Sequence, residues 1–178
     1  DGSTVVFAAG PDLDISSELT VFRTDRVGEA DTVSTVATSA HQPSISGDGS
    51  TVAYSVIADD PASSTITIRE NESVPVALGA GTRPMISRDG NHVVHETDDV
   101  LLLTSWTGDG PDAFAQTDTL TLTGPTAPTA SGPAIDRYGR TVASDSIAVP
   151  DVDADIMLNV LTSDAGFDSD TYQLGSGV

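Results

Sequence analysis

The sequence predicts an all-β protein made of four consecutive four-stranded antiparallel units, the first of them incomplete. The main observation is a 14-residue segment that occurs three times, with its second half also opening the chain. The copies are Pro43–Val56, Pro84–Thr97, Pro133–Ser146 and the half-copy Asp1–Ala9. Their turn glycines follow one another at intervals of 47, 41 and 49 residues. A repeat of this length, in a chain rich in Val, Thr and Ser, indicates units of several strands each.

Each full copy is predicted to form a β-hairpin. In the first, a short strand at Ser44–Ser46 leads into an Asp48-Gly49 turn, and a second strand follows from Val52. Glycine permits the positive φ of a tight turn, and the Asp side chain accepts hydrogen bonds from nearby amides. The proline that opens the copy is expected at the start of the first strand, where its missing N–H costs least.

The last copy differs, because Tyr138 stands where the other copies have Asp. Its turn is therefore predicted to keep Gly139 and to lose the side-chain cap. About four strands in each unit of forty-odd residues are typical of the blades of a β-propeller.

The other strands follow from alternation of polar and apolar residues, as in Thr65–Arg69. Beyond the hairpins we expect strands at Leu19–Thr24, Thr32–Thr38, Ser64–Arg69, Pro75–Leu78, Val100–Trp106, Asp118–Thr123, Ile156–Leu161 and Thr171–Leu174. The units are then placed at about 1–42, 43–83, 84–132 and 133–178 of a single partial propeller domain. The Pro- and Thr-rich segment 125–132 is interpreted as a long connection between two units.

Unit one is expected to lack its first strand. The last residues, Leu174–Val178, resemble Leu78–Gly81, which precede the first strand of unit three. A ring closed by pairing strands from the two termini therefore cannot be completed from this sequence. Two interpretations remain open: a segment of a larger propeller, or a unit array whose open edges are covered by another copy or another chain.

The pattern P-x-I-S-x-D-G-x-x-V-x-Y/F-x-S resembles the repeats of TolB-type, WD-like β-propellers. Asp155–Leu158 and Glu18–Asp25 are similar to a strand that follows it in the bacterial secreted variety. Unit three departs most, because Asp98-Asp99 run directly into its third strand. The resemblance implies a protein-interaction platform, a ligand-binding ring or a gating domain attached to a separate hydrolase; the repeat alone does not select among them.

The composition excludes several classes of partner and site. The chain has no cysteine, so disulfides and thiolate metal sites are excluded. Seven Arg, no Lys and 27 acidic residues give a net charge of −20, which repels nucleic acid and anionic membranes and attracts cations or basic proteins. We therefore expect a protein partner or self-association through open blade edges, no nucleic acid and no membrane insertion.

The acidic composition has two explanations, adaptation to high salt or secretion from a high-GC organism, and we favour the second. No stretch is long and apolar enough to span a membrane, and no signal peptide is evident, although the chain begins inside a repeat. An extracellular or cell-surface location is expected.

Alternating carboxylates occur in two loops. They are Asp151, Asp153 and Asp155 in unit four, and Asp12 and Asp14 in unit one. Such carboxylates could converge on Ca²⁺, which prefers six to eight oxygen ligands. The spacing lacks the glycine and distal glutamate of an EF-hand loop, and we favour the alternative that these side chains shape the loop by bonding to its amides.

Three further residues attract notice. His92 and His95 form an H-x-x-H pair, but residues three apart on a strand point to opposite faces, so joint metal ligation is not expected. We expect His92 to be solvated beside its turn and His95 to be packed. The single tryptophan, Trp106, suggests either cover for a blade edge or a sugar- or peptide-binding platform.

No catalytic residue is predicted. The chain has no G-x-S-x-G motif with a strand and helix to hold it, and we expect no enzymatic activity and no cofactor apart from the calcium considered above. The expected function is that of a non-catalytic extracellular or cell-surface binding or scaffold module. The alternatives are the gating or substrate-recruiting propeller of a larger hydrolase or peptidase, and a structural subunit of an assembly completed by inter-chain strand pairing.

Overall fold

A computed structural model describes residues 3–10, 19–28, 30–58, 64–97, 100–106, 117–122, 130–146, 155–161 and 169–174. All regular elements in these ranges are strands. They are β1 (Thr4–Ala9), β2 (Thr20–Val27), β3 (Ala30–Thr38), β4 (Ala40–Ile45), β5 (Thr51–Val56), β6 (Thr65–Glu70), β7 (Val76–Ala80), β8 (Thr82–Ile86), β9 (His92–Thr97), β10 (Val100–Trp106), β11 (Thr117–Leu122), β12 (Ala130–Ile135), β13 (Thr141–Ser146), β14 (Asp155–Leu161) and β15 (Ser169–Leu174). The described part contains no helix that could cross a membrane.

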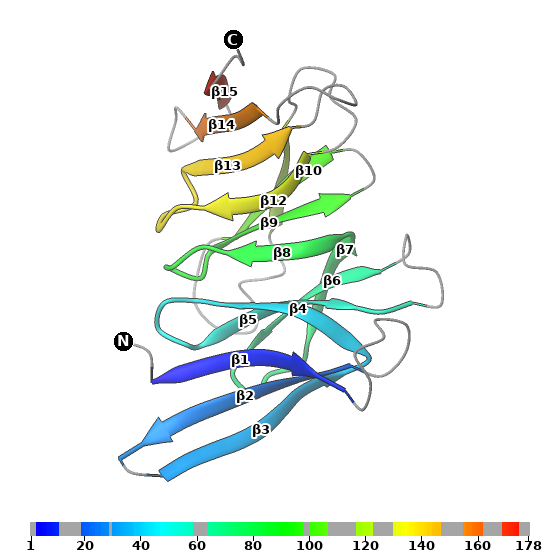
Figure 1. The fold of residues 1–178 in the computed structure, drawn as a ribbon, viewed down its shortest axis with the longest axis vertical. Coiled ribbons are helices and arrows are strands. Elements are labelled where there is room, and N and C mark those ends of the chain that lie inside the picture. The colour runs from blue at the N-terminus through cyan, green and yellow to red at the C-terminus, as the bar shows by residue number, and fades with distance from the viewer. Residues whose placement is uncertain are drawn as a thin grey trace.

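The strands form four antiparallel sheets in which chain order and spatial order agree. The first sheet is β1-β2-β3, and the next three are β4-β5-β6-β7, β8-β9-β10-β11 and β12-β13-β14-β15. Figure 1 shows the sheets following one another along the longest axis of the molecule. The predicted all-β fold of four consecutive units, the first without its opening strand, is confirmed.

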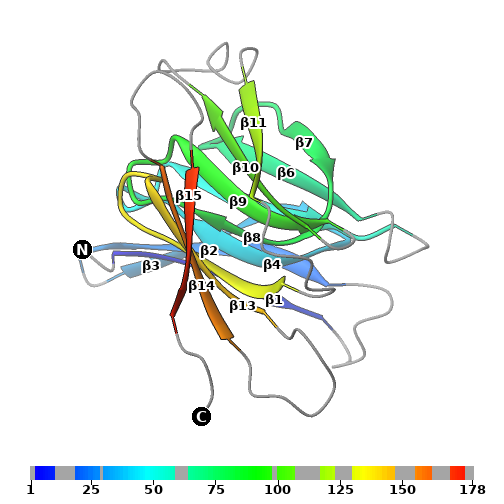
Figure 2. The same ribbon diagram turned by 90° about the horizontal axis from the view of Figure 1, so that it is seen from above.

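Successive sheets are rotated relative to one another. Seen from above, β14 and β15 run across the direction of β1 and β3 (Figure 2). The first strands of sheets two and three are linked directly, because the Arg83 N–H donates to Gln42 Oε1 at 2.9 Å and the Ile86 N–H donates to Ser44 Oγ at 3.1 Å. The sheets therefore stack as blades do, side by side with their first strands adjacent.

Among the side chains that the structure describes, the core consists of three apolar clusters, one between each pair of neighbouring sheets. The first contains Val21 of sheet one with Ala40, Val52 and Tyr54 of sheet two. The second joins Ala53, Ile66 and Ile68 to Ile86, Val93 and Trp106. The third joins Val94, Leu101 and Leu103 to Val142.

The central strands are buried on both faces. On β5, Val52 and Tyr54 pack toward sheet one, whereas the intervening Ala53 packs toward sheet three. Successive side chains of a strand point to opposite faces, so one run of small and apolar residues serves two interfaces. This explains why these strands read as nearly continuous apolar runs.

The prolines of the repeat lie inside their strands, so the expectation that they open the strand was wrong. Pairing is interrupted between His41 and Ser44 around Pro43, and the corresponding register shifts surround Pro84 and Pro133. The residues before the first two prolines, Gln42 and Arg83, have φ of 51° and 52°. A bulge leaves a residue without a ladder partner, so a proline there removes no hydrogen bond.

Candidate functional site

The hairpin turns of sheets two, three and four form a continuous column. The Gly47 N–H donates to the Arg88 carbonyl at 2.8 Å, and the Asp89 N–H donates to the Arg137 carbonyl at 3.1 Å. These bonds join each turn to the next along the stack. We call this set of turns, residues 46–50, 87–91 and 136–140, the turn column.

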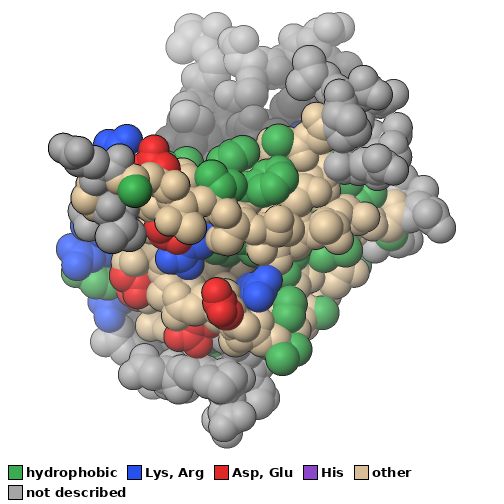
Figure 3. All heavy atoms as spheres, turned by 90° about the horizontal axis from the view of Figure 1, so that it is seen from below, with side chains coloured by type: hydrophobic (Ala, Val, Ile, Leu, Met, Phe, Trp, Pro, Cys, Tyr) green, Lys and Arg blue, Asp and Glu red, His purple; other side chains and the backbone are tan. Residues whose placement is uncertain are grey.

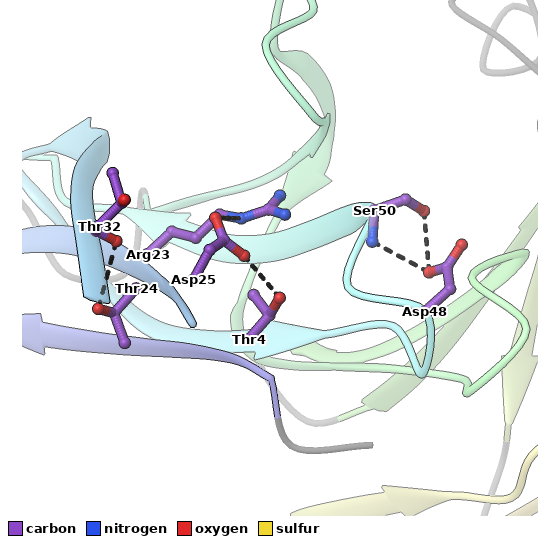
Figure 4. A network of polar contacts seen from close by, with 7 residues as sticks. All are labelled: Thr4, Arg23, Thr24, Asp25, Thr32, Asp48 and Ser50. Atoms are coloured by element: carbon purple, nitrogen blue, oxygen red, sulfur yellow. Dashed lines mark hydrogen bonds and ion pairs between the residues drawn. The ribbon is translucent and has the colours of Figure 1, made fainter. Parts of the chain in front are cut away.

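In the first turn of the column, the side chains of a Ser and an Asp both accept hydrogen bonds from backbone amides. Asp48 Oδ1 accepts from the Ser46 hydroxyl at 2.6 Å and from the Ser50 N–H at 3.0 Å, and Ser46 Oγ accepts from the Thr51 N–H at 3.0 Å. Figure 4 shows Asp48 facing Ser50. Burial raises the pKa of Asp48, but the hydrogen bonds from Ser46 and Ser50 outweigh it and leave the pKa below its ordinary value.

The second turn repeats this arrangement. The Ser87 hydroxyl donates to Asp89 Oδ1 at 2.5 Å, the Asn91 N–H donates to the same oxygen at 3.1 Å, and the His92 N–H donates to Ser87 Oγ at 3.1 Å. The following glycines, Gly49 and Gly90, have φ of 79° and 80°. Such φ values favour glycine, as the sequence predicted.

The third turn is capped by a different residue, so the prediction that it loses its cap was wrong. Asp136 occupies the position of Ser46, and its Oδ1 accepts from the Arg140 N–H at 2.7 Å and from the Thr141 N–H at 3.1 Å. One carboxylate thus replaces both the Ser and the Asp of the other turns. The compensation is possible because an Asp side chain reaches amides several residues ahead.

His92 lies between sheet three and the turn of sheet four. Its Nδ1 is 2.8 Å from Ser105 Oγ on β10, and a Cβ added at Gly139 would overlap the imidazole ring. Burial lowers the pKa of His92. The expectation of a solvated His92 was therefore wrong, because its ring lies between Ser105 and the backbone of Gly139.

His95 faces the other way and is packed, as predicted. It is 1% exposed and lies against Gly81 on the side of sheet two. Neither ring nitrogen has a hydrogen-bond partner among the described residues, and burial lowers the pKa of His95 to about 4. His92 and His95 thus occupy opposite faces of β9, which confirms that they do not form a joint site.

Trp106 belongs to the core between sheets two and three. It is 4% exposed and packs in the cluster that contains Ile66 and Ile86. Both expectations for this residue, cover for a blade edge and a binding platform, were wrong. A single sequence does not reveal which sheet a residue at the end of a strand will face.

The calcium prediction falls largely outside the described residues. Asp12, Asp14, Asp151 and Asp153 lie there, and Asp155 is described only through its backbone, which opens β14 opposite Ser146. Within the side chains that the structure does describe, no three His, Asp or Glu residues come together as metal ligands. Both alternatives, calcium binding and the favoured one that these side chains shape the loop, stay predictions.

A polar network between β1 and β2 was not predicted from the sequence. Asp25 accepts from the Thr4 hydroxyl at 2.6 Å and forms an ion pair with Arg23 at 2.7 Å (Figure 4). The hydrogen bond from Arg23 lowers the pKa of Asp25 most, and the hydrogen bond from Thr4 lowers it further. The available signal was the spacing of Arg23 and Asp25, two apart on one predicted strand and hence on the same face.

Comparisons with known proteins identify the fold. No protein-family model and no curated protein sequence matches the chain. Among solved structures, a protein assigned as TolB from Agrobacterium tumefaciens is similar with a TM-score of 0.62 and 18% identity, over 98% of this chain and 62% of that protein. The β-propeller domain of the Trilobed protease from Pyrococcus furiosus also has a TM-score of 0.62, with 12% identity, over 100% of this chain and 55% of that one.

An acylaminoacyl peptidase from Pyrococcus horikoshii is similar over 97% of this chain and 30% of its own, with a TM-score of 0.56 and 14% identity. The chain thus spans about three fifths or less of the lengths of these structures. At such low identities the likeness concerns the fold, and it agrees with the open array of sheets. The chain has the fold of a segment of a TolB-like β-propeller.

Proposed function

We propose that the chain is a non-catalytic binding or scaffold module of an extracellular or cell-surface protein. The observation that carries this proposal is that the Asp and His side chains of the candidate site have structural roles. Asp48, Asp89 and Asp136 hold the turn column, and His92 and His95 are packed between sheets. Groups engaged in this way support a platform, and recognition then belongs to the surface and to the loops between strands.

The charge of the module indicates the chemistry of its partner. A net charge of −20 favours a basic protein surface or a basic peptide and raises the rate at which such a partner associates. The location outside the cell is part of the proposal. It is supported by the acidic composition and by the resemblance of the repeats to secreted propellers.

Two measurements test this function. We expect calorimetry to detect binding of a Lys- and Arg-rich peptide that weakens with added salt, and no binding of a Glu-rich peptide of the same length. We also expect a fluorophosphonate probe, which labels activated serines, to leave Ser105 unmodified in mass spectrometry. Equal affinity for both peptides would refute the partner chemistry, and labelling of Ser105 would refute the non-catalytic assignment.

A second candidate is the propeller portion of a larger peptidase. The similarity to the propeller domain of the Trilobed protease and to an acylaminoacyl peptidase favours it. Sequencing the complete reading frame separates the two candidates. A hydrolase domain in the same frame would support the second, and a frame without one would support the first.

A further inference from the structure

One face of the first sheet is apolar and exposed. Val5 and Phe7 on β1 are 49% and 41% exposed, and Val33 on β3 is 60% exposed. Phe7 lies opposite Phe22 of β2, and the two rings stack with their centroids 5.6 Å apart. We call Val5, Phe7, Phe22 and Val33 the end face. Figure 3 views this end of the molecule and shows hydrophobic side chains at the surface among polar and charged ones.

The residues equivalent to the end face are buried in the other sheets. Aligned on the turn glycines, Val5 and Phe7 correspond to Val52 and Tyr54 of sheet two. Val52 and Tyr54 are only 3% and 1% exposed, because sheet one covers them. The equivalent Val93 of sheet three and Val142 of sheet four are covered in the same way by the sheet before each.

The covering surface is also repeated. Ile66 and Ile68 of β6 cover Val93, and Leu101 and Leu103 of β10 cover Val142. Ile66 and Ile68 are opposite Ser55 and Ala53 in the β5–β6 register.

In sheet four the equivalent register positions belong to Ile156 and Leu158, opposite Asp145 and Ala143. Sheet four, at one end of the stack, thus has the residue types of the covering surface at the equivalent positions. Sheet one, at the other end, has the surface that is covered in the other sheets.

We propose that the end face docks the fourth sheet of a second copy of this chain, which reproduces the interface already formed three times within one copy. This inference goes beyond the proposed binding function and does not depend on it. The contact is head to tail, so it closes into a ring if two copies complete one turn and otherwise propagates into an open chain.

Charge modulates the association. Two copies, each of net charge −20, repel one another at low ionic strength. On the end-face side of β2, Arg26 is neutralised by its ion pair with Asp31 at 3.2 Å, whereas Arg23 and Asp25 pair on the opposite face. Salt that screens the long-range repulsion leaves the apolar contact intact, so association strengthens with ionic strength.

Cross-linking tests whether the contact is head to tail. Because the chain has no native cysteine, only the introduced cysteines can react. One preparation carries Val5→Cys and another carries Leu158→Cys, and each is treated with a short bismaleimide alone and after mixing in molar NaCl. We expect a cross-linked dimer only in the mixture. A dimer from Val5→Cys alone would overturn the proposal in favour of a symmetric contact between two end faces, and no dimer in any sample would overturn self-association.

Light scattering over a concentration series tests the affinity. We expect the mass of the unmodified chain to rise with concentration and with salt, and Phe7→Glu to remain monomeric under the same conditions. Val74→Glu is the matched control, because Val74 is 82% exposed in the β6–β7 turn of sheet two and is not one of the end-face residues. Circular dichroism shows whether both variants are folded. A constant monomer mass for the unmodified chain, or an equal loss of mass in both variants, would overturn the proposal and assign the end face to a different partner.

Discussion

His95 is the residue whose surroundings conflict most with its chemistry. The repeat places it where sheet two has Tyr54 and sheet one has Phe7, so three of the four copies have a ring at this position and the copy in sheet four has a Ser. The imidazole supplies the ring, but its two nitrogens have no hydrogen-bond partner in the described part of the molecule. A buried polar group without partners destabilises the fold, and a proton on the ring would cost more.

This conflict predicts that stability falls in mild acid. The pKa of His95 is about 4 when folded against 6.5 ordinarily, so the unfolded chain binds more protons between these values. The contribution of neutral His95 to the free energy of unfolding is fully present above about pH 6.5. It is lost progressively as the pH falls toward 4, by on the order of 3 kcal/mol. Urea unfolding at pH 7.5 and pH 5 measures it, and His95→Phe is expected to flatten the difference. An unchanged pH dependence in this variant would assign the acid sensitivity to other groups.

The turn column is the element that most directly joins sequence to architecture. Its backbone bonds connect neighbouring sheets, and its side-chain bonds fix each turn locally. Two chemical solutions occur at the same backbone position: a Ser with an Asp in sheets two and three, and a single Asp in sheet four. The two solutions can therefore be exchanged by mutation.

In sheet four, Asp136→Ser is expected to destabilise the fold by about 1 to 2 kcal/mol. The equivalent Ser46 accepts only from the Thr51 N–H, so a Ser at 136 would serve the Thr141 N–H and leave the Arg140 N–H without its acceptor. Adding Tyr138→Asp restores the Ser–Asp pair of the other turns and should recover most of the loss. Tyr138→Asp alone is the control and should change stability by less than about 0.5 kcal/mol, since Tyr138 is 53% exposed. Asp136→Ser as stable as the unmodified chain would show that Asp136 does not cap the turn, and equal stability of Asp136→Ser and the double variant would show that the two caps cannot be exchanged.

The acidic loop before β14 gives a prediction at the same scale. If Asp151 and Asp153 only shape the loop, as we expect, Ca²⁺ and Mg²⁺ at equal ionic strength will raise the melting temperature equally. Asp153→Asn should then leave the response to both ions unchanged. A rise specific to Ca²⁺ that disappears in Asp153→Asn would instead identify a calcium site, because selective binding to the folded state stabilises it.

The sequence predicted features that depend on neighbouring residues and missed those that depend on distant ones. The Asp48-Gly49 turn and the strand predicted from the alternation of Thr65–Arg69 depend on local patterns, and both formed as expected. The bulge at Pro43 depends on how β4 pairs with β5. The burial of Trp106 and the cover of His92 by Gly139 depend on how two sheets meet. Of the candidate site, the Asp of the first two described turns, the turn glycines, the packing of His95 and the opposite faces of β9 were predicted correctly.

At the scale of the whole molecule, apolar clusters between sheets oppose a large excess of like charge. The three clusters are short-range and insensitive to salt. The excess of 27 acidic over seven basic side chains produces a net repulsion that extends about 10 Å at 0.1 M ionic strength. Added salt should therefore weaken the repulsion without weakening the core.

We accordingly expect the melting temperature at pH 7 to rise by several degrees as NaCl is added, which corresponds to on the order of 1 to 2 kcal/mol for a chain of this length. Because screening is nearly complete once the Debye length approaches about 3 Å near 1 M salt, the gain should level off there if the acidity reflects a secreted origin. A gain that continues well beyond that concentration would favour adaptation to high salt.

The pH provides the control for this experiment. As the pH approaches the sequence pI of about 4.1, the net charge vanishes and the screening contribution should vanish with it. Melting curves are therefore recorded at pH 7 and pH 5 over the same salt series, at a protein concentration low enough for the chain to be monomeric by light scattering. An equal salt response at both pH values would mean that salt acts on apolar burial, and the excess of carboxylates would then not limit the stability of the stack.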